Sequence, residues 1–309
     1  MLSRVADSIY WLGRYIERAE NVARAIDVNL QLQLDLPGEE RPWEPVIQTA
    51  GNADAFFKSY AHVSTENALT FLTFDKENPS SIISCVAAAR ENARCVRERI
   101  SSELWIAINQ FYLKLNDPEV QKQALAAPHA FYCSVKEFSQ LTVGIIQGTM
   151  THDVAWNFAR LGTMIERADQ TSRILDVKYY ILLPDVSMVG MALDTVQWNA
   201  VLKSVGAYEM FHRKNSNVTP QNVAEFLLLS EDFPRSLRYC LEQAEINLKN
   251  IAFPVKGNAD SLRLLGKMRS DMAFSTIEEI IKSGLHEKIE EMQKNLCDLG
   301  TQIWKDFFC

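Results

Sequence analysis

Apolar residues recur at spacings of three and four along most of the chain, which is the period of helices that bury one side. Most of the prolines lie between these stretches, and glycine is scarce, at 12 of 309 residues, so short breaks join the helices. No convincing run of alternating apolar and polar residues indicates a β-strand. The pattern therefore predicts an all-α fold, a multi-helix bundle.

Capping residues and prolines set the expected helix bounds. Ser80 is expected to cap a long helix that ends near Leu115, and Thr219 is expected to cap a helix with a proline in its first turn. Other helices are expected over about residues 3–34, 129–150, 153–183 and 198–212, with a further one that has Pro234 in its first turn and two final segments broken near residues 283–284.

Residues 12–28 and 161–177 repeat one another. Nine of the seventeen aligned positions are identical, where ordinary residue usage gives roughly one by chance. Two copies of such a helix indicate the duplication of a helical bundle. We therefore expect a single domain over residues 1–309, built from two related helical halves, 1–150 and 151–309.

A row of polar residues occurs on both repeated helices, opposite the side that carries the apolar residues. Glu17, Asn21 and Arg24 follow one another at i, i+4 and i+7, which allows a ladder of side-chain hydrogen bonds. Glu20 adds a second carboxylate, and Gly13 removes bulk so that a backbone or a ligand can approach closely. The second helix has the corresponding residues Gly162, Glu166, Asp169, Gln170 and Arg173. A face that only meets water has no reason to keep these residues twice, so we expect both rows to be covered.

Three interpretations of the rows remain open. The first is a buried network of glutamates and arginines that fixes how the two halves dock, because buried charges persist only when paired. The second is a polar pocket in which four arginines hold an anionic or phosphate-bearing molecule: Arg18, Arg24, Arg167 and Arg173. The third is metal binding by the paired carboxylates, but helical di-metal sites add a Glu-x-x-His on facing helices, which this sequence lacks. We expect no metal.

Charge and composition exclude several classes of protein. A formal net charge of -7 and a pI near 5.4 argue against a nucleic-acid binder. The first residues lack the apolar core of a signal peptide, and no apolar window is long enough to span a membrane, so we expect a cytoplasmic location.

The six cysteines lack zinc-ligand spacing, which favours reduced and mostly buried thiols. The five histidines are dispersed, no catalytic cysteine–histidine neighbour is detectable, and no cofactor is expected.

Several longer motifs accompany the repeat. They are MLSRVADS at 1–8, YWLGRY at 10–15, NPSSI at 78–82, ARENAR at 89–94, TSRILDVKY at 171–179 and FPRS at 233–236. Together with IERA at 16–19 and 165–168, which looks like an "ER motif", they resemble the bacterial alpha-E family, a helical family of unknown function. The resemblance covers essentially the full length. It implies an all-helical protein whose genes neighbour, or are fused with, those of a circularly permuted ATP-grasp ligase and a transglutaminase-like cysteine peptidase.

The resemblance also implies a part in an ATP-dependent system that makes or modifies a peptide or amide bond, and it assigns no catalytic residue. The leading hypothesis is a helical accessory subunit of the ligase, because the chain has no phosphate-binding loop and no strands for an ATP-grasp fold. In it, the arginines hold a phosphate or carboxylate while Glu17 or Glu166 moves a proton. The alternatives are a stand-alone helical enzyme with an anion-binding cavity and a purely structural scaffold. Whether the chain is an enzyme stays open.

Overall fold

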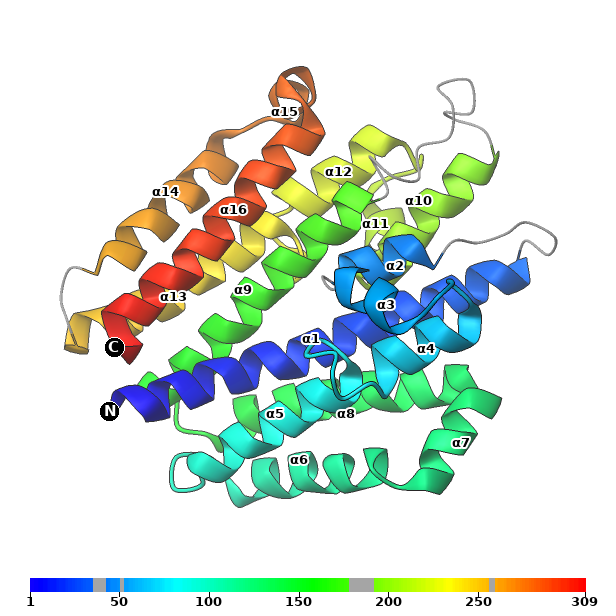
Figure 1. Cartoon of the computed structure of the whole chain (residues 1–309). Helices are drawn as coiled ribbons and strands as arrows, with labels where there is room; N and C mark the ends of the chain where they lie inside the picture. Colours follow the sequence, from blue (N-terminus) through cyan, green and yellow to red (C-terminus); the bar gives the residue numbers. More distant parts are fainter. Residues whose placement is uncertain (36–42, 51–52, 178–191, 256–258) are drawn as a thin grey trace. The chain divides into compact units, whose positions relative to one another are not determined.

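The computed structural model describes residues 1–35, 43–50, 53–177, 192–255 and 259–309. Every regular element in these ranges is a helix, so the predicted all-α fold is confirmed (Figure 1). Contacts between residues divide the chain into two compact units. The N-terminal unit consists of Ser8–Ala159, and the C-terminal unit consists of Arg160–Cys309 together with Met1–Asp7. The helices Ser3–Asp35 and Val154–Asp176 cross this division, and the first belongs mostly to the N-terminal unit and the second mostly to the C-terminal unit.

The N-terminal unit contains one long helix and seven shorter ones in its described residues. They are α1 (Ser3–Asp35), α2 (Glu44–Thr49), α3 (Ala53–Ser59), α4 (Thr65–Thr73), α5 (Ile82–Cys95), α6 (Ser102–Leu115), α7 (Pro118–Ala126) and α8 (Pro128–Thr149). Helix α6 packs against α5 and α8, and α7 packs against α8. Phe111 of α6 stacks on Phe138 of α8, with ring centroids 4.1 Å apart. Aromatic as well as aliphatic side chains therefore hold these helices together.

The C-terminal unit takes up most of the second half of the chain. Its helices are α9 (Val154–Asp176), α10 (Ala192–Ser204), α11 (Tyr208–Lys214), α12 (Pro220–Leu229), α13 (Leu237–Val255), α14 (Asp260–Phe274), α15 (Ile277–Ser283) and α16 (Leu285–Ile303), which ends in a π-helical turn at Trp304–Phe308. Helix α13 packs against α12 and α14, and α16 packs against α14 and α15. The expected continuation of α9 to about residue 183 lies outside the described residues.

The single helix expected from Ser80 to Leu115 is wrong, because the chain forms two helices there. Helix α5 ends at Cys95, and the turn after it leads to Ser101, whose hydroxyl accepts a backbone N–H at 3.2 Å and so caps α6. Apolar residues keep the same spacing through both helices, so the period alone does not reveal the break. The cap of the first helix is Ser81, one residue after the expected position.

Two other helix bounds also differ from the prediction. The helix expected around residues 198–212 is interrupted at Gly206, whose φ of 63° lies in the left-handed region that glycine adopts without strain. The helix expected to have Pro234 in its first turn begins later, at Leu237. Thr219, in contrast, caps α12 as predicted, because its hydroxyl accepts a backbone N–H at 3.2 Å.

The two units begin one of their helices with the same serine cap. Ser81 precedes α5, Ser236 precedes α13, and both serines are fully buried. The Ser81 hydroxyl donates to the backbone carbonyl of Asp75 at 2.7 Å, and the Ser236 hydroxyl donates to that of Ser230 at 2.5 Å. Each hydroxyl also accepts the backbone N–H three residues later, at 3.2 Å. The same cap therefore recurs outside the repeated motif, and the origin of the chain from two related halves stays a prediction.

The cysteines are all free, but the expectation of mostly buried thiols is wrong. Cys85 and Cys240 are buried, and their thiols donate to the carbonyls of Pro79 and Pro234 at 3.8 and 3.6 Å. Cys133 is half-buried. Three cysteines are exposed: Cys95, Cys297 and Cys309. The residue type alone does not tell which side of a helix a cysteine lies on, and that side decides its exposure.

Candidate functional site

The polar row of α1 is covered, as predicted from its repetition. Glu17, Glu20 and Asn21 are each at most 3% exposed, and Gly13 on the same helix is also buried. The Asn21 side-chain amide donates to Glu17 Oε1 at 3.3 Å, which is the first rung of the predicted ladder. A buried carboxylate needs such donors, because burial removes the water that would otherwise solvate it.

The second rung differs from the prediction. Arg24 pairs with Glu20 rather than with Asn21: both Nε and Nη2 lie 2.8 Å from Glu20 Oε1. The other oxygen, Oε2, accepts a hydrogen bond from the Ser139 hydroxyl of α8 at 2.7 Å. A charged acceptor four residues away attracts the guanidinium more strongly than a neutral amide three residues away. Glu20 therefore ties α1 to α8 within the N-terminal unit.

Helix α9 repeats this arrangement in the C-terminal unit. The Gln170 side-chain amide donates to Glu166 Oε1 at 3.4 Å, and both residues are buried. Arg173 pairs with Asp169, with Nε 2.9 Å from Oδ2. This pair is more exposed than the Glu20–Arg24 pair. The same acid–amide and acid–arginine pairs thus form on both helices.

The remaining arginines of the rows are half-buried. The Arg18 guanidinium lies 5.8 Å from the ring centroid of Tyr15, within the range of a cation–π contact. Arg167 Nη1 donates to the backbone carbonyl of Pro234 at 3.3 Å, in the segment that leads to α13. Gly162, the counterpart of the glycine in α1, is buried as well. The described contacts of both rows are those of a network that holds helices in place, and an anion-binding role stays a prediction.

A cluster at the start of α8 was not predicted from the sequence. His129 Nδ1 lies 2.6 Å from Oδ1 of the buried Asp27 on α1, and His129 Nε2 lies 3.6 Å from Cys133 Sγ. Lys136 Nζ contacts the other Asp27 oxygen at 2.7 Å. Within the described residues, this is the one group of three possible metal ligands whose donor atoms lie within 4.8 Å of one another. A signal was present, since a histidine and a cysteine four residues apart share one face of a helix.

The C-terminal unit contains a matching aspartate–histidine pair without the thiol. Asp176 of α9 lies 2.6 Å from Nδ1 of His286, the second residue of α16, just as His129 is the second residue of α8. The hydrogen bond to Asp176 raises the pKa of His286 above its ordinary value of 6.5. Four residues after His286 the chain has Glu290 rather than a cysteine. The two units therefore share the pair and differ in the third group.

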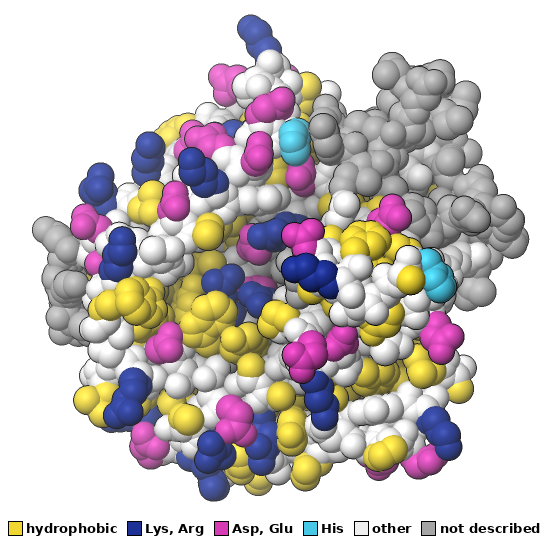
Figure 2. Space-filling model, viewed as in Figure 1, with side chains coloured by type: hydrophobic (Ala, Val, Ile, Leu, Met, Phe, Trp, Pro, Cys, Tyr) yellow, Lys and Arg dark blue, Asp and Glu magenta, His cyan; other side chains and the backbone are white. Residues whose placement is uncertain are grey.

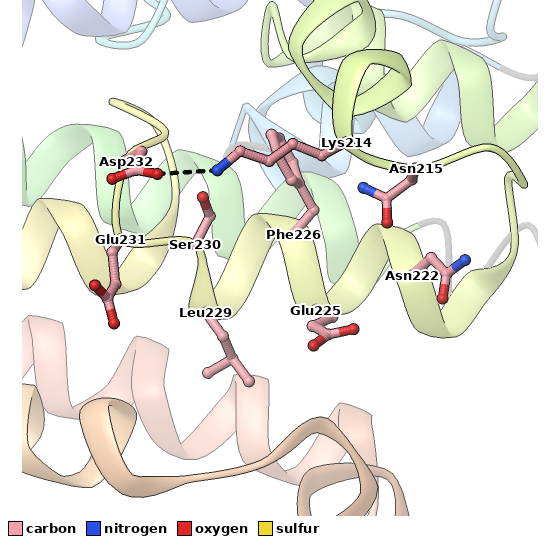
Figure 3. Close-up of a pocket in the computed structure, with 9 residues that line it drawn as sticks. All are labelled: Lys214, Asn215, Asn222, Glu225, Phe226, Leu229, Ser230, Glu231 and Asp232. Atoms are coloured by element: carbon pink, nitrogen blue, oxygen red, sulfur yellow. Dashed lines mark hydrogen bonds and ion pairs between the residues drawn. The ribbon is translucent and has the colours of Figure 1, made fainter.

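A separate hollow of about 350 Å³ opens on the C-terminal unit beside α11 and α12 (Figure 3). Its wall has Lys214 and Asp232, joined by an ion pair of 2.9 Å, and the carboxylates of Glu225 and Glu231. None of the residues singled out in the sequence lines it. The face shown in Figure 2 likewise intermixes acidic and basic side chains.

Comparison with known proteins identifies relatives along the whole chain. The model of the Alpha-E family, described as a predicted alpha-helical domain with a conserved ER motif, matches residues 1–308. An uncharacterized protein of Mycobacterium bovis and uncharacterized proteins of two strains of Mycobacterium tuberculosis are each 24% identical to the chain over 312 aligned positions.

The relatives are much longer than this chain. The alignments cover 94% of the chain but 34% of each relative, so the chain spans about a third of the length of the curated proteins it matches. No solved structure gives a significant match. Among the described residues, no helix is both long and apolar enough to cross a membrane.

Proposed function

Because the chain belongs to the alpha-E family, whose domains are helical and have a conserved ER motif, we propose that it is a cytoplasmic accessory subunit of a circularly permuted ATP-grasp ligase. The joint system would form or modify a peptide or amide bond, with a transglutaminase-like peptidase as a second partner. The subunit would present or receive the activated intermediate, and the ligase would carry out the nucleotide chemistry.

The length of the relatives is the observation that carries this proposal. Each relative holds this helical domain together with a much larger stretch of other sequence, since the match covers 34% of its length. Domains joined in one polypeptide meet at high effective concentration, and separate subunits that associate reach the same proximity. Every regular element in the described part of this chain is a helix, which favours a partner for any step that needs an ATP-grasp fold.

The two rows contain the groups that such a subunit needs to bind an anionic intermediate and to transfer a proton. The half-buried Arg18 and Arg167 directly follow the buried carboxylates Glu17 and Glu166 in sequence. Guanidinium groups bind phosphate and carboxylate through paired hydrogen bonds. A carboxylate that is shielded from water can take or return a proton at the held group. We assign the arginines to holding the intermediate and the glutamates to proton transfer.

Association with the ligase is the first test. The chain and the ATP-grasp ligase encoded in the same genome are co-expressed with a tag on one of them, purified, and assayed for ATP-dependent product formation with and without the chain. Co-purification and a change in the rate or identity of the product are expected. Absence of association together with unchanged products would remove the proposal.

Substitutions in the rows then separate a site from a scaffold. Glu17→Gln and Arg18→Lys should each abolish most of the effect on the ligase while the helical circular dichroism is kept, since lysine lacks the planar fork of arginine. Glu119→Gln, on the exposed face of α7, is the matched control and should have no effect. If Glu17→Gln unfolds the chain and Arg18→Lys retains full activity, the rows serve a scaffold only.

A further inference from the structure

We propose that Cys133 is a nucleophilic thiol that accepts an acyl group from an activated ester or thioester, with His129 as its base and Asp27 as the residue that positions the base. The proposal concerns a cluster within the N-terminal unit and does not depend on a ligase partner. It rests on three contacts: the 3.6 Å between Cys133 Sγ and His129 Nε2, the 2.6 Å between His129 Nδ1 and Asp27 Oδ1, and the partial exposure of the thiol.

The two ring nitrogens of His129 face different groups. A carboxylate accepts hydrogen bonds, so Asp27 at 2.6 Å fixes the proton on Nδ1 and leaves the lone pair of Nε2 directed at the Cys133 thiol. This is the order of nucleophile, base and orienting carboxylate that activates a weak nucleophile in unrelated folds. A separation of 3.6 Å suits a hydrogen bond in which sulfur is the donor.

The orienting carboxylate is held rigidly. Asp27 is 2% exposed, and its second oxygen is bound by Lys136 at 2.7 Å, which balances the carboxylate charge. The same arrangement disfavours a metal ion. An ion here would have to displace His129 or Lys136 from the Asp27 oxygens, and the three possible ligands fall short of the four that structural zinc sites need.

The thiol and the base can both be reached from solvent. The His129 side chain is 65% exposed, and Cys133 is half-buried. The buried Cys85 and Cys240 donate to backbone carbonyls. The exposed Cys95, Cys297 and Cys309 have no histidine within hydrogen-bonding distance in the described part of the chain. Cys133 is therefore chemically distinct among the cysteines.

A purely structural role accounts for the aspartate–histidine pair but not for the thiol. Asp176 and His286 join α9 to α16 with the same 2.6 Å contact, and no cysteine lies four residues after that histidine. Holding two helices together thus requires only the pair. Cys133, beside Nε2 of the ring, gives the pair of the N-terminal unit a neighbouring nucleophile that the pair of the C-terminal unit lacks.

The chemistry balances without any cofactor. The thiol proton of Cys133 passes to His129 Nε2 while the sulfur forms a bond to the carbonyl carbon of the acyl donor. The bond from that carbon to the leaving alcohol or thiol breaks, and the imidazolium returns the proton to the leaving group. The product is an acyl thioester on Cys133, which water or an amine then resolves.

Acylation of the full-length chain tests the proposal. To limit background, the three exposed cysteines are replaced together: Cys95→Ser, Cys297→Ser and Cys309→Ser. This background is mixed with p-nitrophenyl acetate, nitrophenol release is followed, and the acetylated residue is located by peptide mass spectrometry. One equivalent of nitrophenol should be released in a burst, with the acetyl group on Cys133.

Matched variants separate the roles of the three residues. His129→Gln should slow acylation by about 100-fold, the lower range of general-base catalysis. Its counterpart His286→Gln should leave the rate unchanged. Asp27→Asn should slow acylation while the circular dichroism of the parent chain is kept, and it should move the His129 proton from Nδ1 towards Nε2, which ¹⁵N NMR of labelled histidine detects. The matched Asp176→Asn, which removes the same contact from the other pair, should leave the acylation rate unchanged.

Three outcomes overturn the proposal. One is acylation of Cys133 no faster than that of Cys95 in the unsubstituted chain. Another is an unchanged rate in a His129→Gln variant whose circular dichroism is that of the parent chain. The third is stoichiometric, tight binding of Zn²⁺ that is lost with Cys133→Ser, which would assign the cluster to a metal instead.

Discussion

Comparison of the Glu20–Arg24 pair with the Asp169–Arg173 pair measures, within one molecule, how burial changes the contribution of an ion pair to the free energy of unfolding. The Glu20 side chain is 3% exposed and that of Arg24 17%, whereas in the matching pair Asp169 is 14% exposed and Arg173 37%. Glu20→Gln removes the charge that both guanidinium nitrogens contact at 2.8 Å and weakens the acceptor of the Ser139 hydroxyl. Asp169→Asn makes the same change where water can replace the lost partner.

The structure sets the size of each effect. Breaking a buried ion pair by removing one partner costs about 3–5 kcal/mol, and the partial exposure of Arg24 places Glu20→Gln near the lower end, at about 3 kcal/mol. A pair as exposed as Asp169–Arg173 is worth about 1 kcal/mol or less. The free energies of unfolding are measured in urea by far-UV circular dichroism, and we expect Glu20→Gln to cost at least twice as much as Asp169→Asn.

A double substitution supplies the control. Arg24→Met in the Glu20→Gln background removes the guanidinium that was left without its carboxylate, so the double variant should be more stable than Glu20→Gln alone. The reasoning is refuted if Glu20→Gln and Asp169→Asn cost the same, or if the two substitutions on α1 are simply additive.

Three further predictions follow from the C-terminal unit and from α8. The contact with Asp176 raises the pKa of His286, so the protonated pair stabilises the fold fully below about pH 6.5 and loses this contribution as the pH rises through the raised pKa. Thermal melts should therefore show that His286→Gln lowers the melting temperature most at acidic pH and changes it little at basic pH. Ser236→Ala removes a buried helix cap and should lower the free energy of unfolding by about 1–2 kcal/mol in urea titrations, and an unchanged midpoint would contradict the assigned cap. Gly284→Ala places a side chain at φ 101° and should lower the free energy of unfolding by about 1–3 kcal/mol. Gly148→Ala, in open space on α8, should raise the free energy of unfolding by up to about 1 kcal/mol. Changes of the same sign at both glycines would refute this.

The contacts within the repeated helices could be predicted from the sequence only in part. Spacing of four residues predicted the rung from Asn21 to Glu17, and the structure has it. The partner of Arg24 was predicted wrongly, because two carboxylates and an amide share that face and spacing does not rank them. The choice of Glu20 depends on its burial and on Ser139, which another helix supplies.

The order of residues was enough to predict that the chain is helical, which side of each repeated helix is apolar, and that two polar rows recur. These properties follow from a period of 3.6 residues, which is a local rule. Which distant residues meet became visible only in the folded chain: Asp27 and His129 are 102 positions apart, and Asp176 and His286 are 110 apart. A period specifies the side of a helix that must be covered, but the packing of whole helices decides what covers it. Packing therefore supplied Asp27, which orients the histidine that α8 itself places beside Cys133.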